Sequence, residues 1–169
     1  MAVSLRPARP ADDAFLLALF EAARPELVQI DLPPAEKKAL VVWQFEAQRQ
    51  DYERRFPDAT KQIILRQGNP VGLLWRHDSD AEIRLLDIAL MPANRNAGIG
   101  TTLLNRLKQQ AENAGKPLRY TVQQSNQAAL RLYLRRGFTP VLEMAGHILM
   151  EWQPASVTPN DTPVARTNT

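Results

Sequence analysis

The sequence contains no cysteine and only two histidines, His77 and His147, among 169 residues. Without cysteine the chain can form no disulfide, no thiolate metal site and no thiol nucleophile. Two histidines are too few to indicate a metal centre, so we expect no metal. Apolar runs are also short, because none approaches the roughly 18 residues of a membrane-spanning helix. A secretory signal is missing from the N-terminal residues, and we expect a cytoplasmic protein without a membrane partner.

Strong charge of one sign is equally absent. The net charge is +3, and basic residues are scattered among acidic ones rather than gathered in a block, so nucleic acid is not an expected partner. A length of 169 residues favours one domain. We place that domain at residues 1–153, because Pro, Ser, Thr, Asn and Asp dominate residues 154–169 and predict a disordered tail.

Hydrophobic periodicity predicts two helices and four strands in the first half of the chain. The first strand stops before Pro7, and either Asp12 or Asp13 caps the first helix, which ends near Arg24. The expected elements are a strand at 3–5, a helix from about 13 to 24, a helix at 35–56, a hairpin of strands at 63–65 and 71–75, and a strand at 83–90.

The second half predicts two helices and three more strands. A helix follows residues 95–101 and ends at Gly115, a strand covers 118–122, and Ser125 or Asn126 caps a short helix that ends at Gly137. Two closing strands follow at 138–143 and 147–152. Strands that alternate with helices after an antiparallel meander predict an α/β (α+β) fold, with a mixed sheet and helices packed on it.

The segment from Arg95 to Thr101 contains two glycines where a strand gives way to a helix. The first N–H groups of a helix have no internal partner and carry the positive end of its dipole, so they bind anions. Gly98 and Gly100 tolerate unusual dihedral angles and allow a pyrophosphate close to the backbone. The alternative is a tight turn without a ligand. Two other phosphate motifs are absent: the P-loop needs a lysine after Gly100, and the dinucleotide fingerprint needs a third glycine where Leu103 stands.

Two spaced motifs occur together across one strand: Arg-x-x-Gly-x-Gly, and Asn-x-x-Ala-x-x-x-Tyr-x-x-x-Gly-Phe, which runs from Asn126 to Phe138. This combination resembles the GNAT superfamily of acetyl-CoA-dependent N-acetyltransferases, over most of residues 1–152. The resemblance implies a mostly antiparallel sheet of six to seven strands with about four helices, and acetyl-CoA between the fourth and fifth strands. It implies cofactor contacts at Ala89, Leu90, Arg95, Asn96, Ala97, Gly98, Ile99, Gly100, Thr101, Asn126 and Tyr133.

Attack of an amine on the acetyl thioester needs a base, a donor to the developing oxyanion and an acid. Glu82, Asp87 and His147 are the candidate bases. The resemblance places the oxyanion donor, a backbone N–H at a bulge of the fourth strand, near Ile88 to Leu90. Tyr133 is the candidate acid. Each has an alternative: an ion pair for Glu82 or Asp87, a structural role for His147 and a core position for Tyr133. Asn126 can be a helix cap alone.

The predicted function is direct transfer of an acetyl group from acetyl-CoA to a primary amine of a small molecule or a protein. Direct transfer is expected because no cysteine is available to carry the acetyl group. The alternative is an inactive relative that binds CoA as a regulator. The sequence leaves the acceptor open, and it leaves open whether the chain is a monomer or a homodimer. One of Arg131, Arg135 and Arg136 could reach the 3′-phosphate of CoA, or all three could lie on a solvated helix face.

Overall fold

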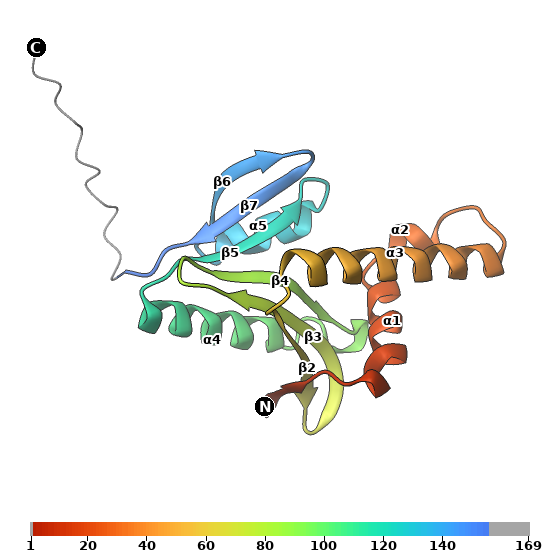
Figure 1. Cartoon of the computed structure of the whole chain (residues 1–169), viewed down its shortest axis with the longest axis horizontal. Coiled ribbons are helices and arrows are strands. Elements are labelled where there is room, and N and C mark those ends of the chain that lie inside the picture. The colour runs from red at the N-terminus through yellow and green to blue at the C-terminus, as the bar shows by residue number, and fades with distance from the viewer. Residues whose placement is uncertain (1, 156–169) are drawn as a thin grey trace, which may run out of the picture.

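A computed structural model describes residues 2–155, and it is shown in Figure 1. These residues form seven strands, five α-helices and two short 3₁₀ helices. The strands are β1 (Val3–Pro7), β2 (Thr60–Arg66), β3 (Asn69–Asp78), β4 (Ile83–Leu90), β5 (Leu118–Gln123), β6 (Thr139–Met144) and β7 (His147–Trp152). The helices are α1 (Asp13–Ala22), α2 (Pro25–Val28), α3 (Pro34–Arg55), α4 (Ile99–Ala114) and α5 (Gln127–Arg135), with 3₁₀ turns at Pro10–Asp12 and Pro92–Asn94.

The strands form one mixed sheet in the order β1-β2-β3-β4-β5-β7-β6. Every neighbouring pair is antiparallel except β4 and β5, which are parallel because α4 carries the chain back between them. This confirms the mixed α/β fold. The sequence predicted the two closing strands but not that β7 lies between β5 and β6.

The two halves of the sheet are joined only at one end. Ile83, Arg84 and Leu85 of β4 pair with Leu118, Arg119 and Tyr120 of β5, and no further pairs follow. The register of β4 against β3 shifts here, because Arg76 faces Leu85 and Trp75 faces Asp87, which leaves Leu86 as the extra residue of a bulge. Beyond Leu86 the halves separate, and Figure 1 shows β5, β6 and β7 diverging from β4.

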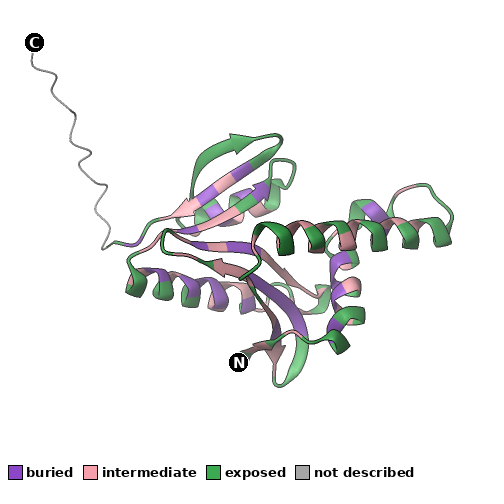
Figure 2. Cartoon of the chain, in the orientation of Figure 1, coloured by how far each residue is buried: buried purple, intermediate pink, exposed green. Residues whose placement is uncertain are grey.

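Helices cover both faces of the sheet and build two main cores. α4 packs its buried stripe of Leu103, Leu104, Leu107 and Ala111 on one face, and Figure 2 shows the alternation of buried and exposed residues along this helix. On the other face, Leu16 and Leu19 of α1 pack against Leu73 and Trp75, with Phe45 and Tyr52 of α3 beside them. Burying one leucine side chain stabilises the fold by roughly 1.5–3 kcal/mol, so these layers hold the sheet in place.

Several element boundaries differ from those predicted. β1 includes Pro7, which the edge position of this strand tolerates, since an edge strand has one unpaired side. α2 was not predicted, and it begins with Pro25 at its first position, where a missing N–H costs no hydrogen bond. Asp12 does not cap α1 through its side chain; it is buried and accepts hydrogen bonds from the Arg6 guanidinium at 2.8 Å and from the Arg9 N–H at 2.8 Å.

The end of the domain lies slightly later than predicted. Pro154 is fully buried, and the N–H of Ala155 donates to Glu112 of α4 at 3.0 Å. These two residues therefore remain attached to the domain, whereas we had assigned them to the tail. The rest of that expected tail, residues 156–169, lies outside the described residues.

Candidate active site

The loop between β4 and α4 presents free backbone donors. Gly98 precedes the helix with φ = 81° and Asn96 has φ = 60°, both in the left-handed region. Thr102 is the first residue whose N–H bonds back, to the carbonyl of Gly98 at 3.0 Å. Within residues 2–155 the N–H groups of Ile99, Gly100 and Thr101 have no protein acceptor. Three free donors at the positive end of a helix of 16 residues are an arrangement that favours an anion, so this helix start is a candidate anion site.

Gly100 serves this loop in a different way from Gly98. It lies inside the helix without a positive φ, so of the two glycines only Gly98 uses the conformational freedom that glycine allows. A Cβ built at Gly100 meets no heavy atom within 4 Å. The protein itself therefore does not exclude a side chain at position 100. Because glycine has none, open space remains directly beside the free N–H groups.

Two arginines hold the loop from either side. Arg95 donates to the carbonyl of Leu90 at 3.1 Å and to the carbonyl of Ala22 at 3.2 Å, so its side chain ties the loop to the end of α1. Arg136 donates to the hydroxyl of Thr101 at 2.6 Å. Of the three arginines near α5 that the sequence could not distinguish, Arg136 is the one beside the anion-binding helix start.

Beyond Leu85 the edge of β4 faces the gap in the sheet and forms no further pairs with β5. Ala89 and Leu90 lie on this stretch. Gly72 of β3 lies behind it, and a Cβ at Gly72 would stand 2.3 Å from the carbonyl oxygen of Ala89, so only glycine lets the two strands approach this closely. The bulge is at Leu86 and not within Ile88 to Leu90, which corrects its expected position. An unpaired strand edge offers N–H and C=O groups to an extended ligand.

Tyr133 of α5 is buried in the core beside the gap. Its ring packs edge to face on Tyr120 at 5.0 Å and on Phe138 at 5.2 Å between ring centroids. Within the described chain its hydroxyl has no hydrogen-bond partner. Burial raises the pKa of Tyr133 well above its usual value, and the charge of Asp87 raises it further. The phenol is therefore protonated at neutral pH.

Asp87 of β4 retains a small accessible area in a hollow, but the surrounding protein desolvates its carboxylate. This burial raises the pKa of Asp87, while the charge of Arg24, a hydrogen bond from the Ile88 backbone and the charge of Lys61 act in the opposite direction. The charge of Asp87 in turn acts on the buried phenols of three elements, Tyr52 of α3, Tyr120 of β5 and Tyr133 of α5. The predicted base and the predicted acid are therefore near enough for the charge of one to act on the other.

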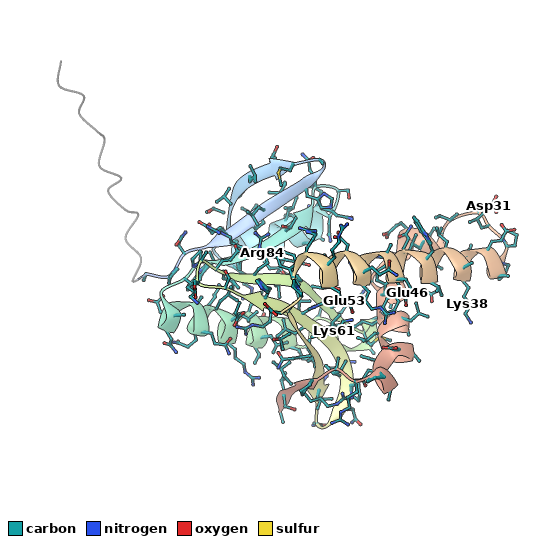
Figure 3. The ribbon with its side chains drawn as sticks, viewed as in Figure 1. Asp31, Lys38, Glu46, Glu53, Lys61 and Arg84 are labelled. Carbon is teal, nitrogen blue, oxygen red and sulfur yellow. The ribbon has the colours of Figure 1, made fainter. Side chains whose placement is uncertain are left out.

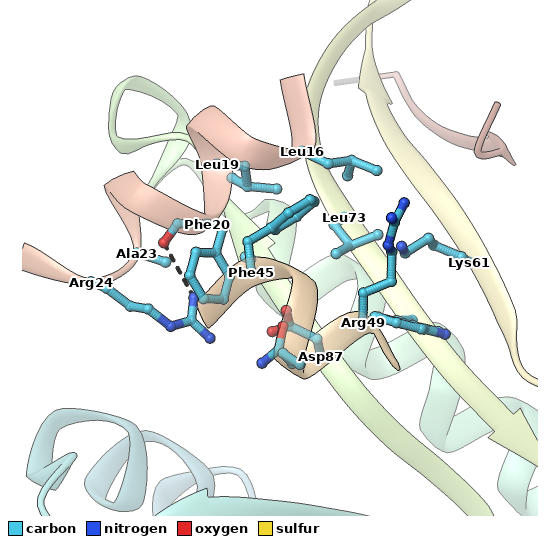
Figure 4. A pocket seen from close by; sticks show the side chains of 13 residues that line it. Leu16, Leu19, Phe20, Ala23, Arg24, Phe45, Arg49, Lys61, Leu73 and Asp87 are labelled. Atoms are coloured by element: carbon cyan, nitrogen blue, oxygen red, sulfur yellow. Dashed lines mark hydrogen bonds between the residues drawn. The ribbon is translucent and has the colours of Figure 1, made fainter. Parts of the chain in front are cut away.

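Asp87 lies in a small hollow beneath α1 and α3. Figure 4 shows this hollow with Phe20 and Phe45 near its centre and Asp87 below them. Three cationic side chains, Arg24, Arg49 and Lys61, line the hollow together with Gln48. The other lining residues are apolar: Leu16, Leu19, Phe20, Ala23, Phe45, Leu73, Trp75 and Ala89. It lies on the α1 and α3 face of the sheet, the face opposite α4.

Glu82 is not close to this pair. It precedes β4 at the joined end of the sheet, where it accepts from Arg84 at 3.0 Å and from Arg119 at 3.0 Å. Arg119 also pairs with Glu151 of β7 at 2.8 Å. Burial alone would raise the pKa of Glu82, but the hydrogen bonds from both arginines outweigh it and hold that pKa below its usual value. A carboxylate held in this way is a weak proton acceptor.

The remaining candidates have local partners. His147 is exposed at the turn between β6 and β7, with Nδ1 at 3.3 Å from the Ala145 carbonyl oxygen. Asn126 caps α5, since its side chain accepts from the N–H of Ala129 at 3.1 Å. Among residues 2–155 no three acidic or histidine side chains gather in a way that could hold a metal ion. None of the helices in that part of the chain combines the length and apolarity needed to cross a bilayer.

Arg24, Lys61 and Tyr120 lie around Asp87, and the sequence did not indicate them as site residues. Their positions in the sequence carry little signal. Arg24 follows the end of α1, Lys61 is the second residue of β2, and Tyr120 fits the alternating pattern of β5. Only the packing of α1, α3 and β5 around β4 brings them to Asp87.

Comparison with known proteins agrees with this geometry. The family model described as the acetyltransferase (GNAT) family matches residues 19–138, more than half of the chain. Among solved structures, the PaiA N-acetyltransferase of Thermoplasma acidophilum in complex with coenzyme A is 16% identical, with a TM-score of 0.66 over 90% of this chain and 99% of that one. YncA of Salmonella typhimurium, in a structure with its cofactor acetyl-CoA, is 19% identical, with a TM-score of 0.57 over 96% and 99%. No curated protein matches.

The chain belongs to the GNAT family of acetyltransferases. It is therefore an acyltransferase enzyme, and acetyl-CoA is its acetyl donor. The free N–H groups at the start of α4, the open space at Gly100 and the unpaired edge of β4 suit the pyrophosphate and the extended arm of this donor.

Proposed function

We propose that this enzyme transfers the acetyl group of acetyl-CoA directly to a primary amine. The observation that carries the proposal is the position of Asp87 and Tyr133 on the two sides of the gap between β4 and β5. Asp87 lies on the stretch of β4 beyond its last pair with β5, and the ring of Tyr133 packs on Tyr120 of β5. One is a carboxylate with a raised pKa that is exposed to a hollow, and the other is a protonated phenol without a partner. A raised pKa makes the carboxylate a stronger base, and the phenol has a free proton to donate, so the two groups can act as general base and general acid.

The β4–α4 loop is the proposed pyrophosphate site. In this proposal the backbone N–H groups of Ile99, Gly100 and Thr101 bind phosphate oxygens, and Asn96, Ala97 and Gly98 shape the turn. Arg95 acts through its bonds to Leu90 and Ala22, which hold the loop in place. Ala89 and Leu90 offer backbone groups to the arm that lies in the gap of the sheet. Asn126 contributes by starting α5, which carries Tyr133.

The hollow beside Asp87 is the proposed acceptor site. Acetyl-CoA supplies an acetyl carbon activated as a thioester, so that transfer forms one carbon–nitrogen bond and breaks one carbon–sulfur bond. Asp87 accepts the proton that leaves the amine nitrogen. Tyr133 donates its hydroxyl proton to the departing sulfur, and exchange with solvent restores both groups. A backbone N–H near the bulge at Leu86 is the proposed donor to the acetyl oxygen.

Glu82 has a structural role in this proposal, because its two carboxylate oxygens are engaged by arginines at the joined end of the sheet. The alternative of a CoA-binding regulator without turnover has the same loop but needs neither Asp87 nor Tyr133. The two functions therefore differ in a single measurable property, which is release of the thiol.

The test combines binding and turnover. Acetyl-CoA should bind the purified full chain and raise its Tm, and incubation with a panel of primary amines should release free thiol and form the corresponding amides. Binding without release of thiol from any amine would favour the regulator. Absence of acetyl-CoA binding would contradict the assignment of the loop.

A further inference from the structure

The hollow beside Asp87 has an excess of positive charge. Arg24, Arg49 and Lys61 line it, and Asp87 is the one carboxylate among its lining residues. A site that took a cationic amine with no other charged group would have little use for three cations. The charge pattern therefore points to an acceptor that carries a negative group besides its amine.

Two of the three cations lack a carboxylate partner within residues 2–155. Arg49 pairs with Glu46 at 2.5 Å. Lys61 makes no ion pair within 4.0 Å, and its ammonium lies 4.1 Å from the centre of the Trp75 ring. Arg24 donates to the carbonyl of Phe20 at 3.2 Å and lies 3.5 Å from the ring centre of the same residue, also without an ion pair.

The environment of Lys61 favours the binding of an anion. The side chain is partly buried, and this burial lowers the pKa of Lys61, although Glu53, Asp13 and Asp87 act against the effect from a distance. Figure 3 shows Glu46 and Glu53 on α3 and Lys61 nearby on β2. A desolvated ammonium without a bonded partner gains more from an added carboxylate than an exposed one does.

The cations flank the proposed base. In Figure 4, Arg24 lies on one side of Asp87, and Lys61 and Arg49 lie on the other. Leu16, Leu19 and Phe45 cover the space between them. The cationic and the apolar side chains thus line one small, partly enclosed hollow, so a single bound molecule would contact both kinds.

We propose that the acceptor is a small amine that also carries a carboxylate, as amino acids do, with its amine beside Asp87, its carboxylate bound by Lys61 and its aliphatic part against Leu16, Leu19 and Phe45. This proposal rests on the acetyl transfer proposed above. Arg24 and Arg49 add positive charge on the two sides of the site. A diamine or polyamine is disfavoured, because its second ammonium group would face cations instead of carboxylates.

The experiment compares matched acceptors. Each of several amino acids is paired with its own carboxamide, which keeps the amine and the side chain and removes the negative charge, and a diamine completes the panel. With saturating acetyl-CoA, we expect the kcat/KM of the preferred amino acid to exceed that of its carboxamide by about 10- to 100-fold, the effect of one charged hydrogen bond. The diamine should be the poorest acceptor.

The variant Lys61→Met keeps the length and packing of the side chain on Trp75 without its charge. It should raise the KM of the amino acid about tenfold or more and change kcat/KM of the carboxamide far less, so that the preference is largely lost. The matched control is Lys38→Met, at an exposed position of α3 away from the hollow (Figure 3), which should alter neither value.

Two outcomes overturn the proposal, and they are distinguishable. If amino acids and carboxamides are acetylated equally, or if the diamine is the best acceptor, acetyl transfer stands and the carboxylate-bearing acceptor is wrong. If acetyl-CoA binds but no amine in a broad panel releases thiol, the transfer itself is wrong and the acceptor proposal falls with it.

Discussion

At the scale of single residues, Asp87 and Tyr133 differ from ordinary surface groups because the protein withdraws water from both. Desolvation penalises the charged form, so it raises the pKa of a carboxyl and of a phenol alike. The consequence differs for the two. A carboxylate becomes a better base, whereas a phenol becomes more firmly protonated and remains a proton donor.

Asp87→Asn should lower kcat by about 10²- to 10⁴-fold, the usual contribution of a general base. Stability should not fall, because a raised pKa means that the folded protein binds this proton more tightly than the unfolded chain, so ionised Asp87 opposes folding at neutral pH. The Tm should be equal or higher, as thermal denaturation would measure.

The pH profile tests the same residue. In the wild type, kcat/KM should fall as pH drops through the raised pKa of Asp87, at a pH above the ordinary aspartate value of about 3.9. The Asn variant should keep only the limb that comes from protonation of the amine. Retention of wild-type kcat by the variant would remove Asp87 from the mechanism.

Tyr133→Phe keeps the ring that packs on Tyr120 and Phe138 and removes only the hydroxyl. We expect kcat to fall by about 10²-fold or more, with acetyl-CoA affinity and Tm nearly unchanged. Tyr120→Phe is the matched control, since the charge of Asp87 also acts on this buried phenol but no proton transfer is assigned to it. Equal rate losses in the two variants would show that Tyr133 has no special role as acid.

At the scale of elements, the start of α4 shows how one short stretch serves two purposes. Gly98 allows the left-handed turn that begins the helix, and Gly100 leaves space at its first turn. The sequence predicted the turn and the helix correctly as local features, and the anion site at the helix start stays a prediction. It did not distinguish the two glycines, because the difference depends on the backbone angles and on what surrounds each Cα.

Gly100→Ala should separate folding from binding. Alanine favours a helix over glycine by up to about 1 kcal/mol, so the Tm should stay equal or rise by a few degrees. Its methyl group enters the space beside the free N–H groups, and we expect acetyl-CoA affinity to fall at least about tenfold, as titration calorimetry would measure.

Gly98→Ala gives the contrast. Alanine at φ = 81° is strained by about 1–2 kcal/mol, so this variant should lower the Tm. Unchanged affinity for acetyl-CoA in Gly100→Ala would contradict the assignment of the pyrophosphate to this helix start.

At the scale of the whole molecule, β4 and β5 are paired at one end of the sheet and separated at the other. Only three residue pairs join β4 to β5. The ion pairs of Glu82, Arg84, Arg119 and Glu151 lie at this same end and connect β4, β5 and β7. Their side chains are between 12% and 29% exposed, so water screens them only in part. They compensate for the few backbone bonds between the halves.

Glu82→Gln should therefore destabilise the protein by about 1–3 kcal/mol, since it leaves the partly buried Arg84 without its carboxylate and Arg119 with Glu151 alone. The pKa of Glu82 is lowered in the folded state, so its contribution is present above the unfolded value of about 4.3 and is lost as pH falls through the folded value. Chemical denaturation at pH 7 and at pH 3 should show the difference between wild type and variant shrinking at the lower pH.

Asp51→Asn is the control for Glu82→Gln, because it removes a more exposed pairing with Arg54 and Arg55 and should cost less than about 1 kcal/mol. Below the Tm, kcat/KM of Glu82→Gln should match the wild type. A folded Glu82→Gln protein that has lost about 100-fold in kcat would restore Glu82 as the base.

The sequence by itself determined the features that neighbouring residues control. Prolines and glycines set where α3 begins and where α4 ends, and alternating or helical periodicity set the strands and the amphipathic helices. Two spaced motifs were enough to indicate the family. Backbone preferences and hydrophobic periodicity act within a few turns of chain, so they are written in consecutive residues.

Tertiary structure alone decided which side chains meet. Glu82 and Asp87 are five positions apart and were equal as candidate bases, yet one is bound by two arginines and the other faces a hollow. Lys61 and Arg24 reach that hollow from separate elements, and β7 enters the sheet beside β5. Burial and pairing between distant segments set these positions, and a linear pattern does not record them.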